Sequence, residues 1–231
     1  MRSSARASPW REPDASGPMI GTSREERLGW LRETDPVRLA ELWRLADETR
    51  RRCVGDDVHL RGLVEISNVC VRTCGYCGIR AGRRGLERYR MAADEVLACA
   101  RTAVRLGYGT LVLQAGEDPG LDGPSVADLV RRVKAETPLA VTLSLGEREE
   151  ADLALWREAG ADRYLLRFET SNRALFDRIH PPRDGSRSDR RAQLRRLAAL
   201  GYEVGSGVMV GIPGQTWDDL AADLDLFEEL A

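Results

Sequence analysis

The sequence predicts an α/β fold in which helices cover a parallel sheet, and three observations support this prediction. Strand and helix patterns alternate about five times after residue 58, which calls for a parallel sheet with helices outside it. Short apolar runs such as 139–145 suit strands that are buried on both faces. The segments between them have apolar residues at helical spacing and stop at glycines such as Gly107 and Gly160.

The first elements along the chain are helical. Residues 1–22 are rich in Ser, Arg, Pro and Gly without a period, so we expect them to be disordered. Ser23 can cap a helix that follows it, and Asp35-Pro36 can open a second helix with leucines along one stripe.

The later elements follow as strand and helix pairs. The strands are predicted at residues 58–67, 110–114, 139–145, 162–168 and 202–211. The helices are predicted at residues 91–107, 124–136, 147–160, 172–180, 188–201 and 216–230. Short loops between such units favour a (β/α) barrel of the TIM type, and an open sheet of the flavodoxin type is the alternative.

Five strands are fewer than the roughly eight that close such a barrel. We therefore expect a barrel that is incomplete at its C-terminal end and leaves a strand edge to be covered. The expected parts are a disordered segment (1–22), a helical extension (23–57) and the barrel (58–231). Missing strands would expose core residues, so we expect this length of chain alone to be inactive or poorly soluble.

Composition excludes several classes of protein. The 35 basic and 37 acidic residues give a net charge of −2, which disfavours a polycationic nucleic-acid binder. No apolar run reaches the roughly 18 residues of a membrane span, and the N-terminus lacks the apolar core of a secretory signal. The five cysteines do not resemble a disulfide framework, so we expect a cytoplasmic protein with reduced thiols.

Three cysteines provide the densest chemical signal. Cys70, Cys74 and Cys77 follow the first predicted strand, at the end of a barrel where active sites form. Three thiolates this close can bind a [4Fe–4S] cluster and leave one iron open to a ligand. A structural zinc site or unligated thiols are the alternatives. Cys53 and Cys99 lie on predicted helices and are expected to be packed thiols.

Polar residues also gather where the second and third strands end. Gly116 would let the backbone approach a ligand, and the adjacent Glu117 could hold an ammonium group; an acidic turn is the alternative. Thr142 and Ser144 are two residues apart and therefore share a face of their strand. They are either hydroxyls of the barrel lumen or ordinary strand residues.

Charged residues gather after the fourth strand. Arg167 and Glu169 share a face there, and must pair with each other or with a ligand if they are buried. Arg190 has the guanidinium fork that suits a carboxylate, although the charges around it are also typical of a solvated loop.

The cysteine spacing, with Tyr76 before the third cysteine, resembles that of radical S-adenosylmethionine (SAM) enzymes. The segments SNVCVRTCGYCGIR, VTLSLGE and AGADRYLLRFETSN resemble HydE-type maturases of [FeFe]-hydrogenase. Enzymes of the methylornithine synthase or biotin synthase type, which act on organic substrates, are the nearer alternative. A zinc-binding structural or RNA-binding module is the alternative from another class of protein.

The resemblance implies a [4Fe–4S] cluster, SAM and roles for particular residues. The three cysteines would bind the cluster. Residues implied to contact SAM are Tyr76, Gly116, Glu117, Thr142, Arg167, Glu169 and Arg190, with Ser144 toward the substrate. In this scheme Glu117 lies at the SAM amino group, Glu169 at the ribose and Arg190 at the carboxylate. The implied partners are a small-molecule or organometallic iron substrate, a reductant such as ferredoxin or flavodoxin, and other hydrogenase maturases.

Overall fold

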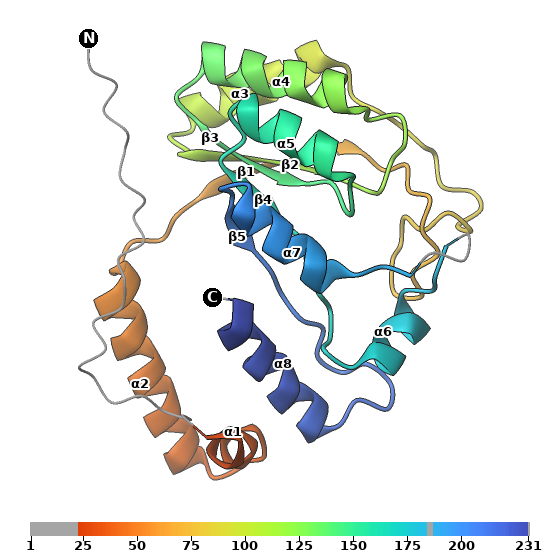
Figure 1. Ribbon diagram of the computed structural model, residues 1–231. Coiled ribbons are helices and arrows are strands. Elements are labelled where there is room, and N and C mark those ends of the chain that lie inside the picture. Colours follow the sequence, from red (N-terminus) through yellow and green to blue (C-terminus); the bar gives the residue numbers. More distant parts are fainter. Residues whose placement is uncertain (1–22, 184–186, 231) are drawn as a thin grey trace.

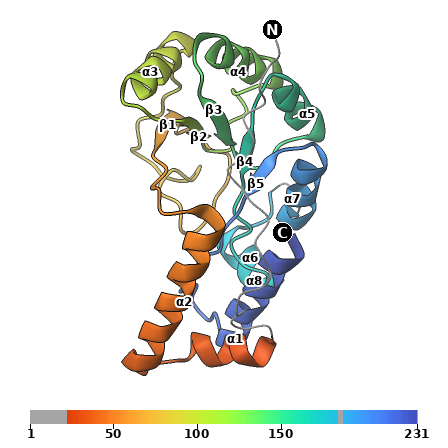
Figure 2. The same ribbon diagram turned by 90° about the vertical axis from the view of Figure 1, so that its left-hand side faces the viewer.

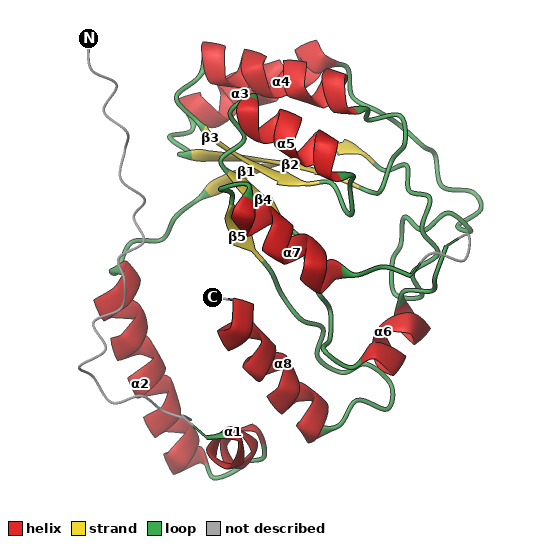
Figure 3. Cartoon of the chain, viewed as in Figure 1, coloured by secondary structure: helices red, strands yellow, loops and turns green. Residues whose placement is uncertain are grey.

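One parallel sheet organises the protein, seen here in a computed structural model that describes residues 23–183 and 187–230. Its five strands follow one another in the order β1-β2-β3-β4-β5, and each neighbouring pair is parallel (Figures 1 and 3). The strands are β1 (Arg61–Ser67), β2 (Thr110–Ala115), β3 (Ala140–Ser144), β4 (Arg163–Leu165) and β5 (Glu203–Gly205). The predicted α/β class with a parallel sheet is confirmed.

The helices on the outer side of the sheet (Figure 2) are α3 (Ala93–Arg105), α4 (Gly123–Glu136), α5 (Glu150–Glu158) and α7 (Arg190–Ala199). Helix α6 (Arg173–Ile179) comes between β4 and α7, and α8 (Trp217–Leu230) follows the last strand, β5. Figure 2 shows α3, α4, α5 and α7 along the outside of the strands, as in a (β/α) barrel. Strands β1 and β5 are the two ends of the sheet order in the described part of the chain. None of the described helices has the length and apolar character that crossing a membrane requires.

Alternation along the strands separates the core from the inner face of the sheet. Val141 and Leu143 are fully buried in the core beneath the helices. Thr142 and Ser144 lie between and after them, so their side chains point to the opposite face. The prediction that these two hydroxyl residues share a face of the strand is therefore confirmed.

The N-terminal helices begin where their caps were predicted. Ser23 forms a capping box at the start of α1 (Arg24–Leu31), and Asp35 caps α2 (Pro36–Val54). Helix α1 packs against α8, and Arg24 Nη1 lies 2.7 Å from Asp225 Oδ2. The expected disorder of residues 1–22 lies outside the described residues, and the division of the chain into parts stays a prediction.

Strands β4 and β5 are shorter than predicted. Regular pairing in β4 ends at Leu165, although the backbone of Glu169 still bridges to that of Val208. Glu169 has a φ of 65°, in the left-handed region that only glycine adopts without cost. This left-handed residue lies four positions beyond the end of β4.

Candidate functional site

The three motif cysteines lie in one loop after β1, which we call the cysteine loop (residues 68–81). Cys74 is buried, and Cys70 and Cys77 are half-buried; all three are free thiols. The backbone N–H of Val71 donates to Glu117 O at 3.0 Å, and that of Gly75 donates to Ile179 O at 2.9 Å. These bonds tie the loop to the segment after β2 and to the end of α6.

Gly116 makes the close packing of the cysteine loop possible. A Cβ atom at this position would lie 2.6 Å from Cys70 Cβ and 3.1 Å from Cys70 Cα, and would overlap the carbonyl oxygen of Val69. Only a residue without a side chain fits there. In the structure Gly116 therefore positions the first cysteine, and its predicted contact with SAM stays a prediction.

Six charged residues of alternating sign cross the site, and we call them the ion ladder. In spatial order they are Glu117, Arg72, Glu147, Arg190, Glu169 and Arg167. Arg72 pairs with Glu117 and lies 3.6 Å from Glu147. Arg190 lies 3.0 Å from Glu147 and 3.4 Å from Glu169, which is 2.9 Å from Arg167. Three carboxylates thus balance three guanidinium groups.

The ladder brings together four of the residues predicted from the sequence. Glu117, Glu169, Arg167 and Arg190 come from three separate segments near the carboxyl ends of the strands. The side chains of Glu169 and Arg190 are only 5% and 9% exposed, which makes the pairing of their charges obligatory. Tyr76, another predicted residue, donates from its hydroxyl to Glu169 Oε1 at 3.0 Å.

The guanidinium group of Arg190 donates hydrogen bonds to several acceptors. Its Nη1 donates to the carbonyl oxygen of Arg167 at 2.6 Å, and its Nε donates to Glu147. Its Nη2 lies 2.8 Å from His180 Nε2. A guanidinium can only donate, so Nε2 accepts and the neutral ring of His180 has its proton on Nδ1. This arrangement fixes the plane of the Arg190 fork.

Burial and the arginines set the protonation states around the ladder. Burial and the nearby charges of Arg190 and Arg72 lower the pKa of His180 to about 4, so the ring is neutral at pH 7. Burial alone would raise the pKa of Glu147, but the Ser188 hydroxyl and the two arginines outweigh it and leave that pKa below its ordinary value. Burial raises the pKa of Cys74 to about 11, so a metal must displace its proton to bind.

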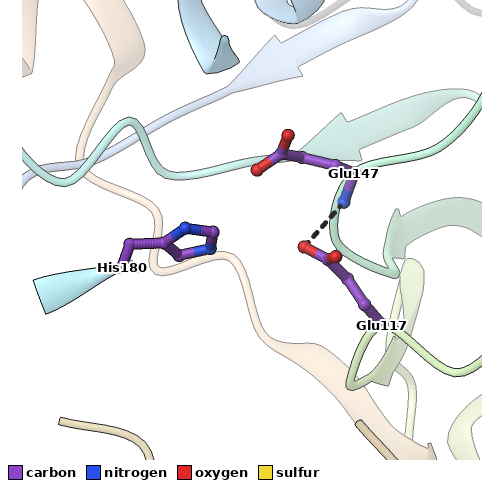
Figure 4. Close-up of side chains that lie close together, drawn as sticks. All are labelled: Glu117, Glu147 and His180. Carbon is purple, nitrogen blue, oxygen red and sulfur yellow. Dashed lines mark hydrogen bonds between the residues drawn. The ribbon is translucent and has the colours of Figure 1, made fainter. Parts of the chain in front are cut away.

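Glu117, Glu147 and His180 lie close together (Figure 4), with one potential ligand atom from each within 4.8 Å of the others. Glu117 Oε1 accepts from the backbone N–H of Glu147 at 3.2 Å. The two guanidinium groups of Arg72 and Arg190 already balance both carboxylates. A divalent cation placed here would meet two positive charges at close range, so the trio is better explained as part of the ion ladder.

The residues fit an iron–sulfur cluster together with a zwitterionic ligand. Three thiols in one loop are a suitable donor set for iron, and the backbone N–H of Arg72 points to Cys70 Sγ at 3.4 Å. Thr142 Oγ1 and His180 Nδ1 are buried polar atoms without a hydrogen-bond partner among the described residues. Such atoms are available to a ligand. Together these features supply thiol donors, paired charges and unused polar atoms at one end of the sheet.

Three residues of the site were missed by the sequence analysis. Arg72 lies inside the cysteine motif, where only the cysteines and Tyr76 were considered. Glu147 was assigned to a helix that in fact begins at Glu150. His180 was not predicted as a site residue, and it contacts Arg190. For Glu147 a signal existed, because it follows the third strand at the same sheet end as Glu117.

An ion pair between the half-exposed Arg90 and the buried Asp118 lies next to the ladder and was missed as well. Arg90 donates from Nε and Nη2 to the two carboxylate oxygens of Asp118, at 2.7 Å each. Asp118 is fully buried and also accepts from the hydroxyl of Ser67 at 2.6 Å. Burial would raise the pKa of Asp118, but these donors outweigh it and lower that pKa. The pair anchors the segment after β2, beside Glu117.

Comparison with known proteins places these features in a family. The profile of the radical SAM superfamily matches residues 64–227. The [FeFe] hydrogenase maturase subunit HydE of Thermotoga maritima is 50% identical over 188 residues, which cover 81% of this chain and 53% of that protein. The 3-methylornithine synthase of Methanosarcina barkeri is 30% identical over 177 residues, covering 75% of this chain and 49% of that protein.

The fold has a counterpart among solved structures. The crystal structure of methylornithine synthase (PylB) superimposes with a TM-score of 0.83 at 26% identity, covering 93% of this chain and 62% of that one. The described strands and helices therefore match part of a radical SAM barrel. The chain spans about half the length of the curated relatives it matches.

Proposed function

The chain belongs to the radical SAM superfamily, and from this premise we propose that the protein is a HydE-type maturase for the metal cluster of [FeFe]-hydrogenase. The observation that supports this choice is the 50% identity to HydE, against 30% to 3-methylornithine synthase over a similar part of the chain. An iron–sulfur cluster and SAM are the cofactors that this family uses.

We propose that Cys70, Cys74 and Cys77 hold the [4Fe–4S] cluster. When bound, the cluster and SAM supply one-electron chemistry, the reductive cleavage of the sulfonium. The protein holds the cysteine loop rigid through Gly116 and through backbone bonds to Glu117 and Ile179. A loop fixed in this way would present the three sulfur atoms to one cluster. The sequence has no fourth cysteine in this loop, so one iron would stay without a protein ligand.

We assign two members of the ion ladder, Glu117 and Arg190, to the amino acid part of SAM. Glu117 would accept a hydrogen bond from the amino group, and the guanidinium fork of Arg190 would bind the carboxylate. Glu169, held by Tyr76 and two arginines, would accept from the ribose hydroxyls.

The remaining predicted contacts follow the same geometry. The hydroxyl of Thr142, which has no hydrogen-bond partner within residues 23–183 and 187–230, lies on the inner face of the sheet and would donate to SAM. Ser144, two residues further along β3, would face the substrate. Gly116 would line the same end of the sheet, and Arg167 would stay at Glu169.

The proposed partners follow from the proposed reaction. An organometallic iron compound would be the substrate, with small organic molecules as the alternative. A low-potential reductant such as ferredoxin or flavodoxin would supply electrons, and other hydrogenase maturases would act beside this protein. A cluster bound by cysteine thiolates, in a protein whose cysteines form no disulfides among the described residues, suits the reducing cytoplasm.

One experiment separates the two substrate classes. The intact protein, reconstituted with iron and sulfide without oxygen, is incubated with SAM, dithionite and lysine. We expect no 3-methylornithine. In parallel, the protein should restore H2 production when added to an [FeFe]-hydrogenase maturation mixture that lacks only its HydE component. Formation of 3-methylornithine, with no restoration of H2 production, would reject the maturase proposal in favour of the organic alternative.

A further inference from the structure

The segment that follows the cysteine loop is basic, and we call it the basic loop (residues 82–90). It contains four arginines and one glutamate, whereas the whole chain has a net charge of −2. Two of these arginines have structural partners. Arg88 donates to two backbone carbonyl oxygens of the cysteine loop, at 2.7 and 2.8 Å, and Arg90 pairs with the buried Asp118. These contacts hold the basic loop against the cysteine loop.

The other two arginines of the basic loop are available to a partner. Arg83 and Arg84 are exposed, and neither side chain forms a hydrogen bond or an ion pair within residues 23–183 and 187–230. Glu87 is the acidic residue of the loop, and with its charge counted against the four arginines the loop keeps a net charge of +3. The loop thus presents positive charge that the described part of the protein does not use.

The unpaired arginines are held close to the third cysteine. The backbone N–H of Arg83 donates to Arg80 O at 3.0 Å, and Arg80 Nη1 donates to Cys77 O at 2.8 Å. The far end of the basic loop is tied to Asn68, whose Oδ1 accepts from the backbone N–H of Tyr89 at 2.8 Å. Two successive hydrogen bonds therefore connect the basic loop to a cysteine of the proposed cluster site. A partner that docks on this loop would lie beside that site.

Two large side chains are exposed among these charges. Leu86 is 36% exposed and Tyr89 is 42% exposed. Tyrosine and arginine are both enriched in protein interfaces, and charged groups at the rim of an interface steer the approach of an oppositely charged partner. The basic loop therefore has the apolar contact and the free positive charge that would dock an acidic protein.

We infer that the basic loop is the docking surface for a small acidic electron-carrier protein. This inference rests on the proposed function, because it names the place where the proposed reductant binds. Reductive cleavage of SAM needs one electron from outside the chain, so the carrier would be oxidised by one electron as the cluster is reduced. Electron carriers dock transiently through small interfaces, for which a loop of this size is sufficient. A nucleic acid would need a more extensive basic surface, which the net charge of −2 does not favour.

The first test is the affinity of the intact, cluster-loaded protein for an oxidised ferredoxin of acidic net charge, measured by isothermal titration calorimetry without oxygen. The double variant Arg83→Glu/Arg84→Glu should bind the ferredoxin roughly tenfold more weakly at low salt, and the difference should shrink at high salt, which screens surface charges. Hydrogen–deuterium exchange should slow at the amides of residues 82–90 in the complex. Arg105→Glu/Arg131→Glu is the matched control, since it changes the net charge equally at exposed positions of α3 and α4. It should bind ferredoxin as wild type does.

The rate of cluster reduction is the second test. Reduced ferredoxin should reduce the cluster of Arg83→Glu/Arg84→Glu roughly tenfold more slowly than that of wild type at low salt. Photoreduced deazaflavin, a small donor that needs no docking surface, should reduce both at the same rate, which also shows that the variant is folded and holds its cluster. The milder variant Arg83→Gln/Arg84→Gln should show a smaller loss with ferredoxin in the same direction.

Several results would overturn the inference. They are unchanged ferredoxin binding in the double variants of the basic loop, an equal loss in the control variant, and a loss that salt does not reduce. If deazaflavin reduces the wild-type cluster but ferredoxin neither binds nor reduces it, the inference fails and the proposed cluster site stands. If neither donor reduces a cluster in the wild-type protein, the proposed function fails together with the inference.

Discussion

Substituting Gly116 by alanine should disturb the cysteine loop more than any other single methyl group added near it. The new Cβ would lie 2.6 Å from Cys70 Cβ, whereas carbon atoms in contact prefer about 3.5 Å or more. The first cysteine must therefore retreat by about 1 Å. Cluster sulfur positions tolerate only about 0.2 Å, so a shift of this size should impair cluster binding.

The energetic cost of the change follows from overpacking. An extra methyl group in a closely packed place costs about 1–3 kcal/mol of unfolding free energy. The neighbours here cannot turn aside easily, because two of the three nearest atoms belong to the backbone of the cysteine loop. That backbone is also tied to the segment after β2 by the hydrogen bond from Val71 to Glu117. We therefore expect a cost in the upper part of this range.

The assay is iron and sulfide content per chain after anaerobic reconstitution, together with the thermal unfolding midpoint. Gly78→Ala is the matched control, since Gly78 lies in the same loop and a Cβ there would have no atom within 4 Å. Gly116→Ala should lose most of its iron and unfold at a lower temperature, while Gly78→Ala should behave as wild type. Full iron loading with an unchanged midpoint in Gly116→Ala would refute the reasoning.

Three further predictions concern stability. The pKa of His180 is about 4 in the folded protein, below its ordinary value of 6.5. The unfolded chain therefore takes up a proton first as the pH falls from 6.5 to 4, and the free energy of unfolding drops by up to about 3 kcal/mol. Urea unfolding at pH 7 and pH 5 should therefore show a smaller loss for His180→Gln than for wild type, and equal losses would contradict it. Asp118 has a lowered pKa, so its carboxylate stabilises the fold above the ordinary pKa of 3.8 and loses this effect as the pH falls below it. Asp118→Asn should therefore unfold at a lower temperature than wild type at pH 7, and the difference in unfolding temperature should shrink toward pH 3. A difference that stays constant with pH would count against this. Trp156 is fully buried and donates to the carbonyl of Gly123 at 2.8 Å, so Trp156→Phe should cost about 1–2 kcal/mol in chemical unfolding, and no change would show that this bond adds nothing.

Local patterns were enough to predict the parallel sheet and the place of the cysteines. Apolar runs such as residues 139–145 mark buried strands whatever the rest of the chain does, and helix caps such as Ser23 act within a few residues. The cysteine motif is also local, and its position after a strand fixes its end of the sheet.

The partners of the charged residues could not be predicted in the same way. Most pairs of the ion ladder join residues that are far apart in the chain, such as Arg72 and Glu117, which are 45 positions apart. Apart from Arg167 and Glu169, which are two residues apart and share a face, no spacing rule links these residues, because they meet only when parallel strands bring their carboxyl ends together. The left-handed backbone of Glu169 could not be predicted either, because an acidic residue does not signal this conformation in the sequence.

The central claim is that three cysteines bind a [4Fe–4S] cluster and leave one iron accessible to SAM. The most direct measurement is the electron paramagnetic resonance spectrum of the reduced, anaerobically reconstituted protein, recorded before and after SAM is added. We predict a four-iron signal whose line positions change when SAM binds. A spectrum that SAM leaves unaltered, or a preparation that contains zinc in place of iron and sulfide, would contradict the claim.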